Sequence, residues 1–390
     1  MQTMATDFES NARSSGPASP PTSRLARWAW AAWLTLIVYG SLTPWSGWRD
    51  AGVSAFSYLT APWPRHLTYF DAVANVLAYV PLGGLSVLAL YPRLRGSRAV
   101  LAAAALGVVL STAMEALQTF LPARVASNVD LLTNGIGAAL GACLAAPFAE
   151  RLIGGGVLAS ISERWIARDV APALVLMALW PLAQIDPGPM LFGNGHALPI
   201  AVPTGIGAIV ATQQPAPPSP RFPPAAFMLA ESLVTLAGLL GAGLALFSIL
   251  RPQAQRYSLA FILCAAGLLA KTLAYGAAFG SEYALVWATP GALVGLALGG
   301  ALMALMALSA RWRPLALARA SLGCLCILVV AVNVVPPNPY HAAWIEQWNP
   351  GKLRHYSAAA TWLSAAWPYA MLTWLVYGLF ARRAAQAGGT

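Results

Sequence analysis

Charged residues are scarce in this chain of 390 residues, because Asp, Glu, Lys and Arg together make up only 9% of it. Soluble domains carry roughly a quarter charged residues, so this scarcity excludes a soluble globular enzyme. Cysteine is scarce too, and all of its occurrences lie inside apolar runs: Cys143, Cys264, Cys324 and Cys326. The sequence therefore predicts no disulfides, and it lacks the paired cysteine spacing of a zinc site.

Apolar sequence is abundant instead, with 58% hydrophobic residues and 15 tryptophans. A helix needs about 20 apolar residues to cross about 30 Å of hydrocarbon, and about ten runs reach that length. The sequence therefore predicts an all-α, polytopic integral membrane bundle without the alternation of a barrel strand. The expected spans are 25–43, 70–90, 99–120, 129–149, 168–185, 225–250, 257–280, 284–308, 315–335 and 358–380.

The formal net charge of +10 arises from basic residues scattered between the apolar runs. This scatter argues against a nucleic-acid partner and follows the positive-inside rule of membrane proteins. Most arginines fall in the connections on the N-terminal side, for example Arg93, Arg95, Arg98 and Arg151. We therefore expect both termini in the cytoplasm of a bacterial inner membrane, with the long loops outside.

The chain divides by composition into four parts. These are 1–23, a disordered cytoplasmic tail; 24–150, a membrane domain of four spans; 151–224, a fifth span with a long Pro/Gly-rich outer loop; and 225–390, a C-terminal membrane domain of about five spans. The apolar stretch 197–211 is too short to span and predicts a re-entrant or interfacial segment. Residues 338–356 predict a short interfacial helix, with a lid over an outer pocket as the alternative.

Polar and ionisable residues inside spans are costly, so they are candidates for function. One group surrounds the outer ends of the second, third and fourth spans: Asp71, Asn75, Glu115, Gln118, Arg124, Asp130 and Asn134. The loop between the third and fourth spans is short, so these spans must pack as antiparallel neighbours. We therefore expect the side chains of this group to share an outward-facing polar pocket.

Three interpretations of this group are open from the sequence. The first is a buried network that locks three helices together, with Arg124 pairing Glu115 or Asp130. The second is a pocket for a polar headgroup, in which Arg124 holds a phosphate or carboxylate. The third makes Glu115 a general base. Since no nucleophile or metal-ligand set accompanies Glu115, the sequence favours a binding protein over an enzyme.

A second constellation lies in the C-terminal half, where Glu231 and Lys271 are expected at matched depth below the outer surface. We expect them to form an intramembrane ion pair, which removes most of the cost of burying either charge. A proton or ion relay is the alternative. The four histidines fall in outer loops without metal-ligand spacing, so the sequence predicts neither a metal nor a cofactor.

Several short motifs of the first four spans occur in a distinctive order. They are Ser41-Leu42-Thr43-Pro44, Asp71, Asn75-x5-Pro81-Leu82-Gly83, Glu115-x-x-Gln118, Arg124, Asp130 and Asn134-x-x-Gly137. Together, over residues 28–149, they resemble the VanZ-like membrane family. That family is named for a protein giving bacteria low-level resistance to the glycopeptide antibiotic teicoplanin. The resemblance implies a role in the cell envelope and does not itself supply a biochemical activity.

By this resemblance we expect a protein that modulates access of glycopeptide antibiotics to wall precursors, or that handles lipid-linked glycans. The expected partners are membrane lipids and a lipid-linked glycan or wall precursor. One alternative is an intramembrane transferase or hydrolase acting on a lipid-linked substrate. The other is an ion- or proton-coupled transporter or flippase that uses Glu231 and Lys271. A polar pocket open to the outer leaflet favours the lipid interpretations, and a sealed, dry network favours a scaffold.

Overall fold

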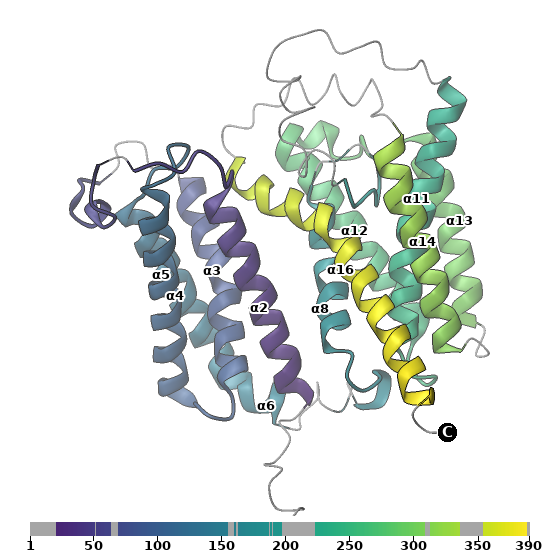
Figure 1. The fold of residues 1–390 in the computed structure, drawn as a ribbon, viewed down its shortest axis with the longest axis horizontal. Coiled ribbons are helices and arrows are strands. Elements are labelled where there is room, and N and C mark those ends of the chain that lie inside the picture. The colour runs from purple at the N-terminus through teal and green to yellow at the C-terminus, as the bar shows by residue number, and fades with distance from the viewer. Residues whose placement is uncertain are drawn as a thin grey trace, which may run out of the picture.

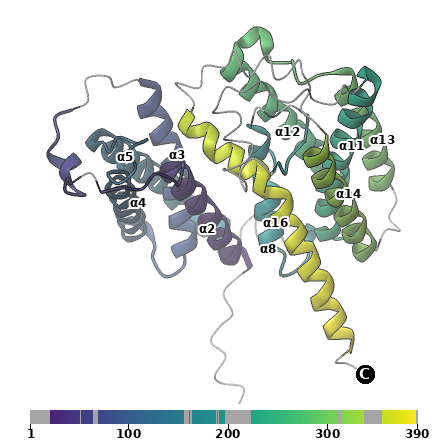
Figure 2. The ribbon, with the colours of Figure 1, turned by 45° about the horizontal axis from the view of Figure 1, so that its top comes forward.

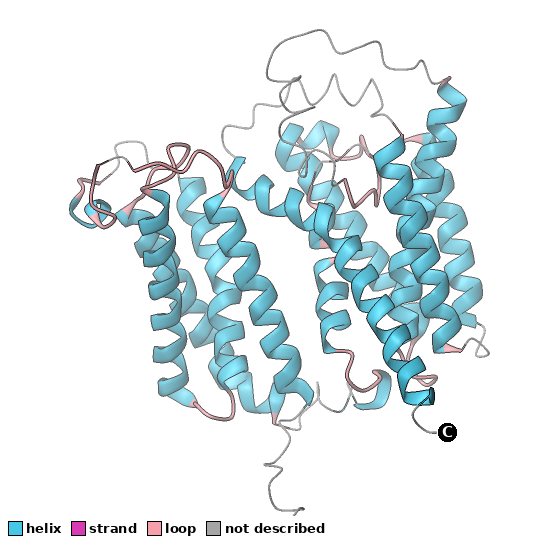
Figure 3. Cartoon of the chain, viewed as in Figure 1, coloured by secondary structure: helices cyan, strands magenta, loops and turns pink. Residues whose placement is uncertain are grey.

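A computed structural model describes residues 21–387, apart from 51, 64–68, 155–159, 161–162, 187, 189, 197–222, 309–312 and 336–353. The described residues form helices and connections (Figure 3), and they contain no strand beyond an isolated antiparallel bridge between Ile166 and Leu250. The predicted all-α class is confirmed. The predicted segment 197–211 lies outside the described residues, as do most of the predicted tail and of the predicted 338–356 helix.

The first bundle consists of α2 Pro21–Leu42, α3 Tyr69–Leu90, α4 Gly96–Gln118 and α5 Asn128–Ala145, followed by the short helices η2 Ala146–Phe148 and α6 Ala149–Ile153. Consecutive long helices run in opposite directions (Figure 1), so α3 and α5 run parallel. Their backbones touch at glycines: a Cβ added to Gly83 would lie 1.9 Å from the Ala138 carbonyl oxygen. Small residues permit such close helix packing within a membrane.

The second bundle consists of α8 Ala171–Leu179, η3 Leu182–Gln184, α11 Pro224–Ile249, α12 Arg256–Phe279, η4 Ser281–Tyr283, α13 Pro290–Leu308, α14 Pro314–Val334 and α16 Arg354–Ala387. Proline opens α11 and α14, where a missing N–H costs nothing. Helix α11 is buried on every side from Ala237 to Ile249. A helix that is apolar all round belongs in an interior, and α11 packs between α13 and α14 as the core of this bundle.

Helix α2 joins the two bundles. It contacts α3 and α4 on one side and α8 and α16 on the other (Figures 1 and 2). The ring of Tyr39 on α2 stacks on Trp362 of α16, with ring centroids 4.8 Å apart. At the opposite end of α2, Arg24 Nη1 lies 2.9 Å from Asp169 Oδ1. That ion pair is exposed and contributes little, so aromatic and apolar packing holds α2 to the second bundle.

Eight helices of the described residues are long and apolar enough to cross a membrane, and they correspond to eight of the predicted spans. Helix α2 matches the first predicted span in position but is not among the eight. The fifth predicted span, 168–185, differs more, because its helical part runs only from Ala171 to Gln184. That length covers about 21 Å, less than a straight crossing. Pro181 follows the last turn of α8 and cannot donate the bond that would continue the helix.

The first residues of α2 and the last residues of α16 lie on the same side as α6 (Figure 1). Which side is cytoplasmic stays a prediction of the positive-inside rule. In a variant without native cysteines, we expect a cysteine replacing Arg49 to react with a membrane-impermeant maleimide in intact cells. A cysteine replacing Arg93 should react only after permeabilisation. Labelling of the Arg93 position in intact cells would reverse the predicted orientation.

Candidate functional site

The polar residues predicted at the outer ends of α3, α4 and α5 are positioned by the start of α5. Ser127 is the N-cap of this helix, and its hydroxyl accepts from the backbone N–H groups of Val129, at 3.2 Å, and Asp130, at 3.4 Å. Serine is favoured there because its side chain satisfies amides that have no partner within the helix. This cap places Asp130 in the first turn and Asn134 one turn deeper on the same face.

Glu115 connects α4 to this helix start. Its side chain is only 3% exposed, and Oε2 accepts from the backbone N–H of Ser127 at 2.8 Å. The amide at a helix start has no partner within the helix, so this carboxyl oxygen satisfies it. The carboxylate of α4 therefore holds the first turn of α5 in place.

Asp130 lies among other polar groups of α3 and α4. Its carboxylate is hydrogen-bonded by the side chain of Asn75 and lies within electrostatic range of Asp71 and Glu115. Asp71, Asn75 and Asp130 are half-buried, whereas Glu115 is buried. The group therefore extends from partly exposed side chains inward to a buried one. We call Asp71, Asn75, Glu115, Asp130 and Asn134 the acidic cluster.

Asn134 is the deepest member of the acidic cluster. Its Nδ2 donates to the hydroxyl of Ser111 at 2.9 Å, and both side chains are buried. Its Oδ1 is buried as well and has no hydrogen-bond partner among the described residues. An unsatisfied buried acceptor costs about 1–3 kcal/mol, so this oxygen is available for one more hydrogen bond.

Arg124 and Gln118 face a different neighbour, the C-terminal end of α2. The guanidinium donates from Nε to the Thr43 carbonyl at 2.8 Å and from Nη2 to the Gly40 carbonyl. Gln118 Nε2 donates to the Ser41 carbonyl at 2.9 Å. The last carbonyls of a helix have no partner within the helix and carry negative partial charge, so a cation is stabilised there.

The expected ion pair of Arg124 with Glu115 or Asp130 is thus replaced by a cap on α2. The guanidinium still acts on both carboxylates through space. The ion pairs between described residues, however, comprise only Arg24 with Asp169. The structure brings the acidic cluster together and directs Arg124 and Gln118 to the adjoining helix end.

The loop after α2 packs over this region through residues that the sequence did not single out. Tyr58, in η1 Ser57–Thr60, is 2% exposed, and its hydroxyl donates to the Thr112 carbonyl at 3.3 Å. Burial, together with the nearby Glu115 carboxylate, raises the pKa of the Tyr58 phenol. Asn128 Nδ2 donates to the Ala61 carbonyl at 2.7 Å. Of the missed residues, only Ser127 carries a readable signal, because serine before Asn-Val-Asp is a typical helix start.

In the second bundle, the predicted pair of Glu231 and Lys271 is replaced by two separate arrangements. Lys271 is 3% exposed, and its Nζ donates to the Asp186 carbonyl at 2.8 Å and the Gly188 carbonyl at 3.0 Å. The acidic side chain that acts on it is Asp186. Glu231 instead accepts from the Thr289 hydroxyl at 2.7 Å. Lys271 and Glu231 have different partners because Lys271 faces the segment after α8, whereas Glu231 faces the start of α13.

The described residues of that segment, 185–196 apart from 187 and 189, are irregular, yet many of them are buried and receive polar side chains from the surrounding helices. Its bonding side chains are Lys271 and Tyr275 from α12, Thr235 from α11, Asn333 from α14, and Thr361, Ser364 and Tyr369 from α16. Irregular backbone at membrane depth requires such enclosure by protein or water.

Among the described residues, no group of three or more His, Cys, Asp or Glu side chains is placed to hold a metal ion. The fold and the polar residues of its spans define a polytopic helical membrane protein with an acidic cluster at one end of the first bundle, opposite the end that carries α6. Residues 26–150, which include the whole of that cluster, match the family model described as VanZ/LLP1, and this confirms the VanZ-like resemblance. Comparison with curated proteins and with solved structures found no match. The match covers most of the first bundle and leaves the second outside it.

Proposed function

We propose that the acidic cluster binds the hydroxyl-rich headgroup of a lipid-linked envelope glycan at the outer side of the membrane. The observation that carries this proposal is the unsatisfied Oδ1 of Asn134, at the inner end of a group of half-buried carboxylates and amides. Carboxylates accept hydrogen bonds from hydroxyl groups, and amides both donate and accept. This set is suited to sugar hydroxyls.

The position of Arg124 supports a glycan over a phosphate as the group bound in the cluster. Its guanidinium donates to carbonyls of α2, while the inward-facing groups of the cluster are acidic or amide side chains. A phosphate beside Asp71, Glu115 and Asp130 would meet like charge, which is destabilising. The lipid's phosphate is therefore expected outside the cluster. Binding of this kind belongs to the same envelope setting as the teicoplanin resistance after which the family is named.

The experiment compares Asp130→Asn with the native chain in lipid nanodiscs. Native mass spectrometry would follow retention of a polyprenyl-linked disaccharide added at increasing concentration. Losing one hydrogen bond to a charged group amounts to about 1.5–3 kcal/mol, so we expect affinity to fall at least tenfold. Asparagine keeps the volume of the side chain and an acceptor oxygen for the Asn75 amide, so the melting temperature should change little.

Glu282→Gln is the matched control, because Glu282 is an exposed acid in η4 of the second bundle, outside the acidic cluster. It should bind the glycan as the native chain does. Unchanged affinity of Asp130→Asn, or no retention by the native chain itself, would overturn the proposal and leave the cluster as a packing network.

A further inference from the structure

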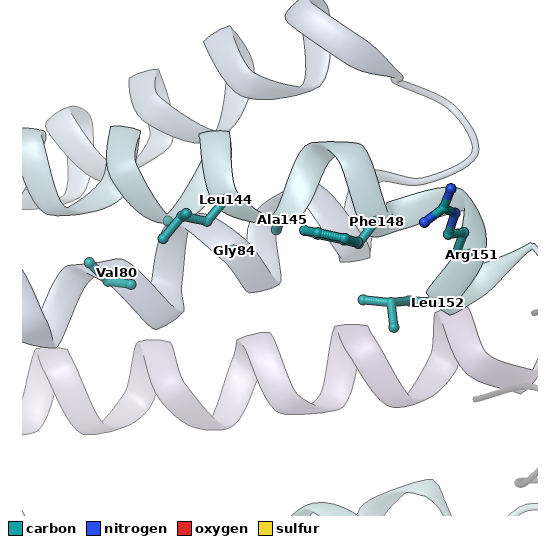
Figure 4. A pocket seen from close by; sticks show the side chains of 8 residues that line it. Val80, Gly84, Leu144, Ala145, Phe148, Arg151 and Leu152 are labelled. Atoms are coloured by element: carbon teal, nitrogen blue, oxygen red, sulfur yellow. The ribbon is translucent and has the colours of Figure 1, made fainter. Parts of the chain in front are cut away.

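A groove lies on the first bundle at the end opposite the acidic cluster. It has a volume of about 480 Å³ and is formed where α3, α5 and α6 meet, with Val80, Leu144, Phe148 and Leu152 among its walls (Figure 4). Leu144 is 65% exposed and Phe148 50% exposed. These helices are membrane spans by length and composition, so the apolar walls of the groove face hydrocarbon.

The floor of the groove is made by small residues at the contact of α3 and α5. A Cβ added to Gly84 would lie 3.4 Å from the Gly141 carbonyl oxygen and 3.6 Å from the Ala145 Cβ. The backbones are thus close together there, while the larger side chains stand on either side. Along α5 and α6, the ten steps from Gly141 to Arg151 correspond to a rise of about 15 Å, half the thickness of the hydrocarbon core.

Arg151 lies at one end of this apolar groove and is its charged member. The side chain is exposed and has no hydrogen-bond or ion-pair partner among the described residues. It belongs to α6, on the side of the bundle that also carries Arg93, Arg95 and Arg98 and that the positive-inside rule assigns to the cytoplasm. A basic residue beside a cleft between helices on that side is suited to an anionic lipid headgroup.

We propose that this groove binds one glycerophospholipid with an anionic headgroup from the cytoplasmic leaflet. One acyl chain lies along Phe148, Leu144 and Val80, and the headgroup phosphate accepts hydrogen bonds from the guanidinium of Arg151. The planar guanidinium matches the oxygens of a phosphate. The site is separate from the acidic cluster, and it needs no glycan to be bound there.

The test uses the full chain in detergent, titrated with phosphatidylglycerol or with phosphatidylcholine and followed by native mass spectrometry. The native chain should retain one phosphatidylglycerol in preference to phosphatidylcholine. Arg151→Gln should lower affinity for phosphatidylglycerol about fivefold, which corresponds to about 1 kcal/mol for one basic residue near anionic lipid, and leave phosphatidylcholine unchanged. Phe148→Ala should weaken the binding of both lipids alike, because it shortens the apolar wall.

Arg98→Gln is the matched control, since Arg98 is an exposed arginine on the same side, in the first turn of α4, and does not line the groove. This variant should still prefer phosphatidylglycerol to phosphatidylcholine, as the native chain does. If Arg151→Gln retains the preference for phosphatidylglycerol, or if Arg98→Gln loses it equally, the preference comes from the general basic surface and the proposal fails. Glycan binding by these variants should be native, so a failure here is distinguishable from a failure of the proposed function.

Discussion

Replacing Lys271 with methionine is expected to lower the free energy of unfolding by about 1.5–3 kcal/mol, the usual contribution of hydrogen bonds made by a charged group. Methionine keeps the length of the side chain and removes the ammonium, so the Asp186 and Gly188 carbonyls lose their donor. Asp186 at the same time loses the cation that acts on it and keeps the Thr361 hydroxyl, which lies 2.7 Å from Oδ1. Thermal unfolding of the purified protein in detergent would measure the change.

Two double variants identify the true partner of Lys271. Lys271→Met combined with Asp186→Asn should recover part of the lost stability, since the carboxylate no longer needs a cation. Lys271→Met combined with Glu231→Gln should be no more stable than the sum of its single changes, because Glu231 bonds Thr289. If the Glu231 change recovers stability instead, Glu231 is the partner of Lys271, as the sequence predicted. A single Lys271→Met variant that melts like the native chain would show that the ammonium does not hold segment 185–196.

Replacing Arg124 with alanine is expected to destabilise the first bundle by about 1.5–3 kcal/mol, the contribution of hydrogen bonds to a charged group. The change leaves the Gly40 and Thr43 carbonyls at the end of α2 without their donor. Because Arg124 is half-buried, water can replace part of the lost bonding, and this limits the effect. A lowered melting temperature in detergent, with glycan affinity retained in the molecules that remain folded, is the expected result.

The double variant of Arg124→Ala with Glu115→Gln distinguishes a helix cap from an ion pair. If Arg124 mainly neutralised Glu115, removing both charges would restore stability. The structure predicts no such recovery, because Glu115 accepts from the Ser127 backbone and Arg124 donates to α2. Arg124→Lys is the conservative control, and it should lose part of the stability since an ammonium lacks the rigid fork that reaches two carbonyls at once. Full recovery in the double variant would contradict the cap.

Helix positions were predictable because each depends on a run of neighbouring residues. The predicted span 225–250 is α11 Pro224–Ile249, and the predicted span 257–280 is α12 Arg256–Phe279. Apolar length and the proline and charged residues at the ends are local properties, so the sequence displays them directly. The fifth span is the exception, since α8 stops at Leu179. The segment that follows, 185–196, is largely buried without being helical, because five polar side chains of α12 and α16 bond to its backbone or side chains. No local sequence pattern reveals those contacts between distant residues.

The sequence by itself determined that the chain is an all-α membrane protein, that its first part is VanZ-like, and that Asp71, Glu115 and Asp130 lie near one end of adjoining spans. Composition, apolar run length and short loops between antiparallel helices suffice for those conclusions. Only the tertiary structure decided the partners of the charged side chains. Arg124 caps α2 and Lys271 holds the segment after α8, rather than pairing with the nearest expected carboxylate. The physical reason is that backbone carbonyls at helix ends and breaks also need donors inside a membrane, and where those carbonyls lie is set by how the helices pack.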